Sequence, residues 1–173
     1  MAKIRELLSK DQINGRLVEL GAQLKHDYQG KDLVLVGILR GSIIFLSDLC
    51  RQIDLPLEID FLGLSSYGDG TETSGIVRMT QDLSSPIQDK DVLVVEDIVD
   101  TGLTMKYLME NLKTRHPRSV KICTFLDKPE GRKVEISADY VAFTIPNHFV
   151  IGYGLDYAQK YRNLPYVGIL EEK

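Results

Sequence analysis

Short apolar runs of strand length alternate along this 173-residue chain with segments of helical periodicity. The runs at 33–39 and 92–95 contain no charged or hydroxyl-bearing residue. Strands of this kind are buried on both faces, which is typical of a parallel sheet covered by helices. Parallel strands are joined by right-handed crossovers, and ligands bind at their carboxyl ends. The pattern therefore predicts an α/β fold whose chemistry follows the strand ends.

Apolar periodicity predicts three helices between the strands. Ser9 is a cap-type residue, and the apolar residues at 13, 17, 20 and 24 form one stripe of a helix that ends at Gly30. A short apolar helix is expected through Cys50, and a third helix has its stripe at 105–112. Further strands are expected at 57–64, 76–80, 120–126, 140–143, 150–152 and 166–170. We therefore expect one α/β domain over residues 1–173, with a parallel central sheet flanked by helices.

The composition is that of an ordinary globular protein, with 43% hydrophobic and 27% charged residues. The 25 acidic residues exceed the 21 Lys and Arg residues, which argues against nucleic acid or an anionic membrane as a partner. No apolar run approaches the ~18 residues of a membrane span, and we expect no targeting segment at the N-terminus. Cys50 and Cys123 have neither metal-binding nor redox spacing, so we expect a cytoplasmic protein.

A polar, glycine-rich loop is expected at residues 65–75, which hold Gly68, Gly70 and Gly75. The segment is too irregular for a packed element and predicts a mobile loop. Its composition does not distinguish a functional lid from an ordinary disordered loop.

The segment 92–104, VLVVEDIVDTGLT, is the most informative stretch of the chain. Here an apolar strand is followed by the carboxylates of Glu96, Asp97 and Asp100, which repel one another and require compensation. Carboxylate oxygens bind magnesium and accept hydrogen bonds from a sugar diol. The three acids therefore predict a metal or diol site.

A phosphate cradle is expected directly after these acids. Gly102 permits a close backbone approach, Thr101 and Thr104 supply hydroxyls, and free N–H groups at a helix start bind anions. A phosphate beside a diol describes a ribose 5-phosphate. The sequence has neither the glycine-lysine ending of a P-loop nor the GxGxxG of dinucleotide folds, so those classes are not favoured. A simpler interpretation stays open, in which Thr101 caps the helix and the acids face solvent.

The run EDIVDTG, residues 96–102, resembles the phosphoribosyl diphosphate (PRPP) binding motif of the type I phosphoribosyltransferases. Segments 39–41, 65–67, 127–129 and 149–157 are similar to those of the hypoxanthine-guanine phosphoribosyltransferases, so the resemblance covers nearly the whole chain. It implies the type I phosphoribosyltransferase fold, with a small hood formed by N- and C-terminal segments. It also implies a magnesium-dependent purine salvage enzyme. Such an enzyme transfers ribose 5-phosphate from PRPP to N9 of hypoxanthine or guanine, giving IMP or GMP and pyrophosphate.

The resemblance also implies which residues bind PRPP and the metal. The implied PRPP and phosphate site comprises Glu96, Asp97, Ile98, Val99, Asp100, Thr101, Gly102, Leu103 and Thr104. The implied pyrophosphate site comprises Arg40, Gly41 and Arg162, with a cis peptide bond between Leu39 and Arg40. The implied Mg²⁺ ligands are Glu96, Asp97 and Asp156, the last partly through water.

The purine site is implied to comprise Lys128, Phe149, Val150 and Asp156. By resemblance, Lys128 donates to the purine 6-oxo group, Phe149 stacks on the base, and Val150 contributes main-chain atoms. Asp100 is the implied general acid/base at purine N7. Ser66 and Tyr67 are implied to close over the reaction centre as a lid that excludes water. The implied partners are the small molecules PRPP and a 6-oxopurine, and a homodimer or homotetramer is expected because the family usually forms one.

Two alternative classes are weighed against the enzyme. A non-catalytic regulator on the same fold would sense PRPP or a nucleotide and could lose catalytic residues, whereas Asp100, Lys128 and Phe149 are in place. A response-regulator receiver has its acid pair after the first strand, whereas Glu96 and Asp97 come at mid-chain. The histidines at 26, 116 and 148 have no ligand spacing and are interpreted as structural or exposed.

Overall fold

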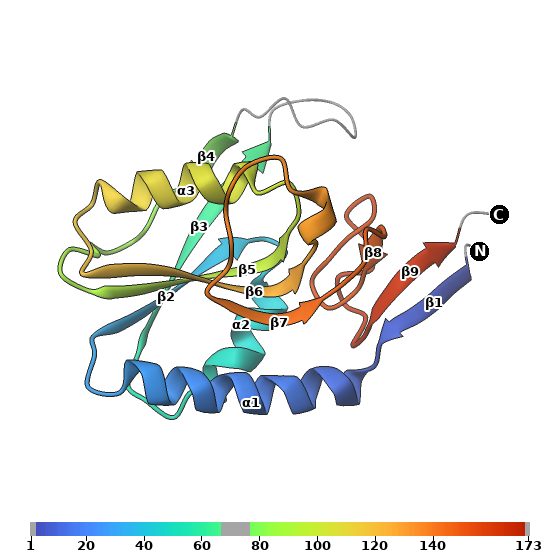
Figure 1. The fold of residues 1–173 in the computed structure, drawn as a ribbon, viewed down its shortest axis with the longest axis horizontal. Coiled ribbons are helices and arrows are strands. Elements are labelled where there is room, and N and C mark those ends of the chain that lie inside the picture. Colours follow the sequence, from blue (N-terminus) through green and yellow to red (C-terminus); the bar gives the residue numbers. More distant parts are fainter. Residues whose placement is uncertain (1–2, 67–76, 172–173) are drawn as a thin grey trace.

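A six-stranded sheet forms the centre of the computed structural model, which describes residues 3–66 and 77–171 (Figure 1). Its strands, in the spatial order β4-β3-β2-β5-β6-β7, are β2 (Leu33–Leu39), β3 (Glu58–Ser66), β4 (Val77–Gln81), β5 (Asp91–Val99), β6 (Ser119–Asp127) and β7 (Tyr140–Thr144). All neighbours are parallel except β3 and β4, which pair antiparallel at the edge. The expected parallel sheet is therefore confirmed apart from β4. The segment between β3 and β4 is too short for the crossover that a parallel pair requires.

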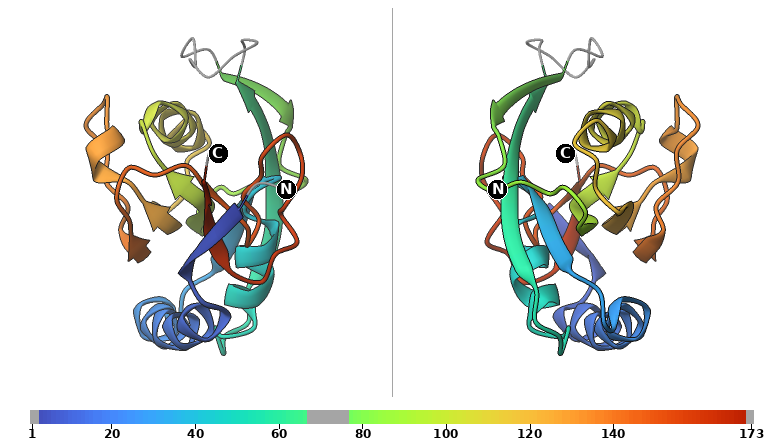
Figure 2. Two further views of the ribbon diagram at one scale, coloured as in Figure 1. Left: turned by 90° about the vertical axis from the view of Figure 1, so that its right-hand side faces the viewer. Right: turned by 90° about the vertical axis from the view of Figure 1, so that its left-hand side faces the viewer.

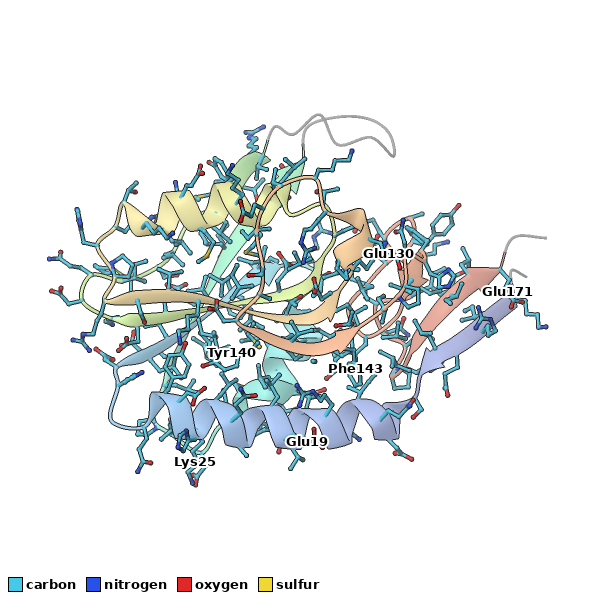
Figure 3. The ribbon with its side chains drawn as sticks, in the orientation of Figure 1. Glu19, Lys25, Glu130, Tyr140, Phe143 and Glu171 are labelled. Carbon is cyan, nitrogen blue, oxygen red and sulfur yellow. The ribbon has the colours of Figure 1, made fainter. Side chains whose placement is uncertain are left out.

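Helices cover both faces of this sheet. α1 (Lys10–Tyr28) and α2 (Ile43–Cys50) lie on one face, and α3 (Leu103–Lys113) lies on the other (Figure 1). Figure 2 shows the same layers from the side. The buried core divides accordingly into two clusters, and Figure 3 shows Tyr140 and Phe143 of β7 between the sheet and α1. Among the helices of the described residues, none has the length and apolar character needed to cross a membrane.

α1 begins and ends as its sequence predicts. The Ser9 hydroxyl accepts a hydrogen bond from Gln12 N (3.2 Å), and the Gln12 side chain accepts one from Ser9 N (2.8 Å). This reciprocal pair is a capping box, which satisfies two donors that the first helical turn leaves free. The predicted stripe at 13, 17, 20 and 24 is buried, and Gly30 has a φ of +75° just beyond the helix.

A second, three-stranded sheet forms the expected hood from the two ends of the chain. Its order is β1-β9-β8, with β1 (Lys3–Leu8), β8 (Val150–Ile151) and β9 (Val167–Glu171), and both pairings are antiparallel. Figure 1 shows β1 and β9 side by side, to one side of the main sheet. The sequence did not predict β1, because KIRELL has no apolar alternation; half of its residues are exposed and none is buried.

Two expected boundaries are corrected. Ser65 and Ser66 belong to β3 rather than to the glycine-rich loop, because both pair with β4. The rest of the expected loop falls on residues 67–76, which lie outside the described residues. β5 continues through Val99, so Glu96 and Asp97 lie within the strand and not after it. The cause is that pairing with β6 persists to the register Val99–Asp127.

We expect Ser9→Ala to lower the free energy of unfolding by about 1 kcal/mol, because the substitution leaves first-turn N–H groups of α1 without their acceptor. Urea denaturation followed by circular dichroism measures this change. Ser137→Ala, at an exposed loop position, is the matched control. Equal stability of Ser9→Ala and the control would contradict the importance of the capping box.

Candidate active site

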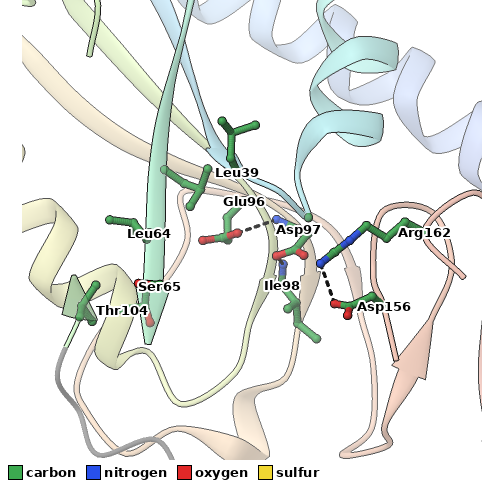
Figure 4. Close-up of a pocket in the computed structure, with 12 residues that line it drawn as sticks. Leu39, Leu64, Ser65, Glu96, Asp97, Ile98, Thr104, Asp156 and Arg162 are labelled. Atoms are coloured by element: carbon green, nitrogen blue, oxygen red, sulfur yellow. Dashed lines mark hydrogen bonds and ion pairs between the residues drawn. The ribbon is translucent and has the colours of Figure 1, made fainter. Parts of the chain in front are cut away.

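The candidate active site is a cleft at the carboxyl ends of the parallel strands, where the sequence predicts it. Its central cavity has a volume of about 310 Å³ and lies between the ends of β2, β3 and β5 and the C-terminal segment (Figure 4). Three further cavities adjoin the same residues, with volumes of about 200, 480 and 240 Å³. Glu96, Asp97 and Arg162 each line more than one of the four cavities. The cleft therefore offers several adjoining subsites.

Two carboxylates, those of the buried Glu96 and the partly buried Asp97, line the central cavity. Glu96 Oε1 accepts a hydrogen bond from Asp97 N (3.0 Å), and Asp97 Oδ1 accepts one from Ile98 N (2.7 Å) (Figure 4). Burial raises the pKa of the Glu96 carboxyl well above its ordinary value, and the charge of Asp97 raises it further. Burial also raises the pKa of the Asp97 carboxyl, and Arg162 opposes that shift. The pair is therefore short of compensating positive charge.

Gly41 brings the loop after β2 against this pair. A Cβ placed at Gly41 would overlap the Asp97 carboxylate, so only glycine allows the approach. The Leu39–Arg40 peptide bond immediately before it is cis, as the resemblance implies.

The expected phosphate cradle is the turn between β5 and α3. Gly102 is the N-cap of α3 and has a left-handed φ of +83°. It lines the cavity of about 200 Å³. Thr101 does not occupy the cap position, although its hydroxyl accepts a long hydrogen bond from Leu103 N (3.4 Å). Thr104 lines both this cavity and the central one. The start of α3, whose first N–H groups have no acceptor within the helix, therefore adjoins a cavity that suits an anion.

An ion pair between Lys128 and Asp100 lies at one side of the cleft. Lys128 Nζ is 3.3 Å from Asp100 Oδ2, and Lys128 is only 7% exposed, so it is not a surface lysine. Gly131 lies so close to Asp100 that a Cβ would overlap Asp100 Oδ1. The Asp100 carboxylate is therefore held on two sides by the segment that follows β6.

The cavity of about 240 Å³ beside this ion pair contains the expected purine-site residues. Its lining includes Asp100, Lys128, Phe149, Val150 and Asp156, together with Ile98, Leu155 and His148, which the sequence did not single out for this role. Phe149 is 58% exposed, with its ring edge-to-face with that of Tyr157 at 5.9 Å. An exposed aromatic ring at a cavity offers a flat apolar surface to a ligand. His148 is exposed, which agrees with the interpretation of the histidines as structural or exposed. The sequence does not predict its position at this cavity.

The expected pyrophosphate residues come from two distant segments. Arg162 lies 2.9 Å from Asp156 Oδ1, and it donates to Gly154 O (2.7 Å) (Figure 4). Arg40 lies across the cavity of about 480 Å³, which both arginines line. Gln159, which the sequence did not single out, accepts a hydrogen bond from each of them. The structure therefore brings Arg40, Gly41 and Arg162 to one end of the cleft.

Arg132 is a second residue that sequence patterns missed. Its guanidinium donates to Val99 O (2.8 Å) and Asp100 O (2.7 Å), and it pairs with Asp127. Lys128 N also donates to Val99 O (3.0 Å). These bonds hold the end of β5 from behind the cleft. No spacing rule signals this role, because the partners of Arg132 in β5 are main-chain oxygens about thirty positions away in the chain.

Some expected site residues stand apart. Leu103 is the first residue of α3, and it lines none of the four cavities. Ser66 is in β3, and Tyr67 lies outside the described residues. Across residues 3–66 and 77–171, no three metal-ligand side chains form one cluster, so Glu96, Asp97 and Asp156 do not make a closed cage. Both Asp156 oxygens are already engaged, by Arg162 and by Gln159 N (2.8 Å).

Comparisons by sequence and by structure both match this chain to phosphoribosyltransferases. The family described as "Phosphoribosyl transferase domain" matches residues 5–158. A hypoxanthine-guanine phosphoribosyltransferase of Streptococcus pneumoniae is 55% identical over 96% of this chain and 93% of that protein. A bifunctional protein TilS/HprT of Listeria monocytogenes is 51% identical over 95% of this chain, which spans only 26% of that protein. A crystal structure of a hypoxanthine phosphoribosyltransferase from Staphylococcus aureus has a TM-score of 0.93 and 53% identity, covering 96% of this chain and 91% of that one.

We expect Glu96→Gln to stabilise the metal-free protein at pH 8. The folded-state pKa of Glu96 is raised above its unfolded value. As pH rises from the unfolded-state pKa through the folded-state pKa, the Glu96 carboxyl therefore lowers the free energy of unfolding. The melting temperature of the variant should therefore exceed that of the parent by several degrees at pH 8, since about 2–4 °C corresponds to each kcal/mol in a chain of this size. The difference should shrink towards pH 4.5.

Thermal unfolding in buffer with a chelator measures this effect, and Glu110→Gln on the exposed face of α3 is the control. A Glu96→Gln variant that melts below the parent at pH 8 would show that the buried charge is fully compensated.

Proposed function

The chain belongs to the phosphoribosyltransferase family, and from that premise we propose that it is a hypoxanthine-guanine phosphoribosyltransferase. It transfers ribose 5-phosphate from PRPP to N9 of hypoxanthine or guanine and releases pyrophosphate with IMP or GMP. One observation carries the proposal: Glu96 lines the cavity at the start of α3, and its neighbour Asp97 lines the cavity that Lys128 and Phe149 also line. A regulator that only senses PRPP or a nucleotide needs no Lys128–Asp100 pair beside a purine-sized cavity, so that alternative is not favoured.

The ribose 5-phosphate part of PRPP is bound by the turn after β5 and by the acid pair. Main-chain N–H groups and hydroxyls from Asp100 to Thr104 hold the 5-phosphate, because the left-handed Gly102 exposes the start of α3. Glu96 and Asp97 accept hydrogen bonds from the ribose hydroxyls. A polyol on this pair supplies hydrogen-bond donors to carboxylate oxygens that are partly removed from bulk water.

A magnesium ion fits the same carboxylates. Mg²⁺ prefers oxygen ligands and usually takes one or two protein carboxylates, with water and substrate phosphates completing its shell, so a closed protein cage is not required. Glu96 and Asp97 would hold it on the ribose side, and Asp156 would reach it through water on the pyrophosphate side. When bound, the ion neutralises negative charge on the pyrophosphate leaving group.

Arg40, the Gly41 main chain and Arg162 bind the pyrophosphate group of PRPP. Two guanidinium groups at one end of the cleft attract a highly charged anion, and guanidinium forks match phosphate oxygens. Their charge also favours departure of pyrophosphate, because the transition state resembles an oxocarbenium ion with negative charge on the leaving group.

The purine lies in the cavity of about 240 Å³ with its face on Phe149. Lys128 donates to the 6-oxo group, which selects hypoxanthine and guanine over adenine, whose 6-amino group is itself a donor. Val150 supplies main-chain atoms to the base edge. As N9 attacks the anomeric carbon and the bond to pyrophosphate breaks, the Asp100 carboxylate takes the proton from N7.

The remaining proposals concern the surroundings of the reaction. The segment with Ser66 and Tyr67 closes over the cleft as a lid and excludes water from the ribosyl cation. The substrates PRPP and a 6-oxopurine are the partners, without nucleic acid or membrane, and the chain forms a homodimer or homotetramer. A cytoplasmic location suits a chain whose Cys50 and Cys123 are free thiols.

Asp100→Asn should lower the turnover number about 10²–10⁴-fold while PRPP affinity changes little, because the amide cannot accept the N7 proton. Release of pyrophosphate from PRPP, magnesium and hypoxanthine is the measurement. Asp32→Asn, exposed before β2, serves as the control. Turnover by Asp100→Asn at the parent rate would remove Asp100 from its role, and a parent without turnover on any purine base would refute the proposed function.

Lys128→Met should raise the KM for hypoxanthine about 10–100-fold, since the variant loses a charged hydrogen bond to the 6-oxo group. The KM for PRPP should stay within a few-fold of the parent, and discrimination against adenine should weaken. Initial rates with hypoxanthine, guanine and adenine measure both effects, with Lys106→Met on the exposed face of α3 as the control. An unchanged preference for hypoxanthine over adenine would contradict the assignment.

A further inference from the structure

Two arginines from opposite ends of the chain share one cavity. Arg40 follows β2, and Arg162 lies in the segment between β8 and β9, yet both line the cavity of about 480 Å³. Their guanidinium groups are permanently positive and repel each other. Asp156 pairs with Arg162, and a group that accepts hydrogen bonds from both arginines would hold them together before an anion binds.

Gln159 is that group. Its side-chain oxygen accepts a hydrogen bond from Arg40 Nη1 (3.2 Å) and another from Arg162 Nη2 (3.4 Å). Its main-chain N donates to Asp156 Oδ2 (2.8 Å), and Asp156 in turn pairs with Arg162. One residue thus connects three side chains of the cleft and joins the loop after β2 to the C-terminal segment.

The backbone presents Gln159 at the tip of a tight turn. Tyr157 and Lys160 exchange two main-chain hydrogen bonds of 3.0 Å, which leaves Ala158 and Gln159 as the two turn residues. Their φ values are +50° and +65°, in the left-handed region that favours Gly and Asn. Gln159 therefore adopts a backbone conformation that glycine adopts more easily.

We infer that Gln159 is a positioning residue that holds Arg40 and Arg162 ready for the pyrophosphate group of PRPP, an inference that rests on the proposed function of this cleft. The neutral amide oxygen takes the place of an anion oxygen in the free protein. Because the amide carries no net charge, displacing it from the two arginines breaks no ion pair of Gln159, whereas Arg162 is also ion-paired with Asp156. A carboxylate at the same position would form stronger, charge-assisted bonds to both arginines and would compete with the substrate.

The test compares Gln159→Gly and Gln159→Glu with the parent. Gln159→Gly removes the amide and relieves the left-handed backbone, so the variant should be at least as stable as the parent yet bind pyrophosphate about 3–10-fold more weakly. Gln159→Glu should bind pyrophosphate more weakly still. Calorimetry with inorganic pyrophosphate and magnesium measures binding, and thermal unfolding measures stability. Gln88→Gly and Gln88→Glu, at an exposed position before β5, are the matched controls.

Steady-state kinetics then distinguish positioning from a general structural role. In both Gln159 variants the KM for PRPP should rise while the KM for hypoxanthine stays at the parent value. Equal rises in the KM for PRPP and the KM for hypoxanthine would overturn the inference. So would parent-like pyrophosphate affinity in the Gln159 variants of a protein that turns over hypoxanthine. Either result would leave the proposed function intact. A parent that turns over no purine but loses pyrophosphate affinity in the variants would refute the proposed function and still support the arrangement of the arginines.

Discussion

The carboxylates of the buried Glu96 and the partly buried Asp97, at the end of a central strand, are the constraint on which the cleft depends. Both residues lie in β5, where pairing with β6 continues past them to Val99, so the sheet holds their main chain in place. A buried ion that lacks a partner costs several kcal/mol. Main-chain N–H groups and the nearby Arg162 supply part of the compensation, and the pKa of Glu96 stays raised. The strand end therefore has a standing affinity for a cation or a polyol.

Close backbone approach, made possible by glycines, connects the other segments to this strand end. Gly41 lies against Asp97, Gly131 lies against Asp100, and Gly154, with a φ of +102°, lies against the carbonyl of Gly41. A Cβ at any of the three would overlap its neighbour. The loop after β2, the turn after β6 and the hood consequently meet at one cleft, which is why it offers sites for phosphate, sugar, base and pyrophosphate together.

The sequence predicted best the elements whose signal is local. The sequence predicts β2 at 33–39 and the strand has those bounds, because an uninterrupted apolar run of this length is typical of a strand buried on both faces. α1 was predicted from a capping residue and a stripe, both of which act within a few residues. β1 was missed because its strand state comes from pairing with β9, at the other end of the chain. The end of β5 was placed too early because its polar residues are held by pairing with β6.

The sequence by itself determined the kinds of groups in the cleft. The acid pair, the glycine turn and the basic residues are local motifs whose chemistry does not depend on packing. Only the tertiary structure decided which groups meet: Lys128 reaches Asp100, Arg132 holds the carbonyl of Val99, and Gln159 joins two arginines. These contacts link segments far apart in the chain, so the local periodicity of the sequence does not predict them. Their geometry follows from the parallel sheet and from the C-terminal segment that lines the same cleft.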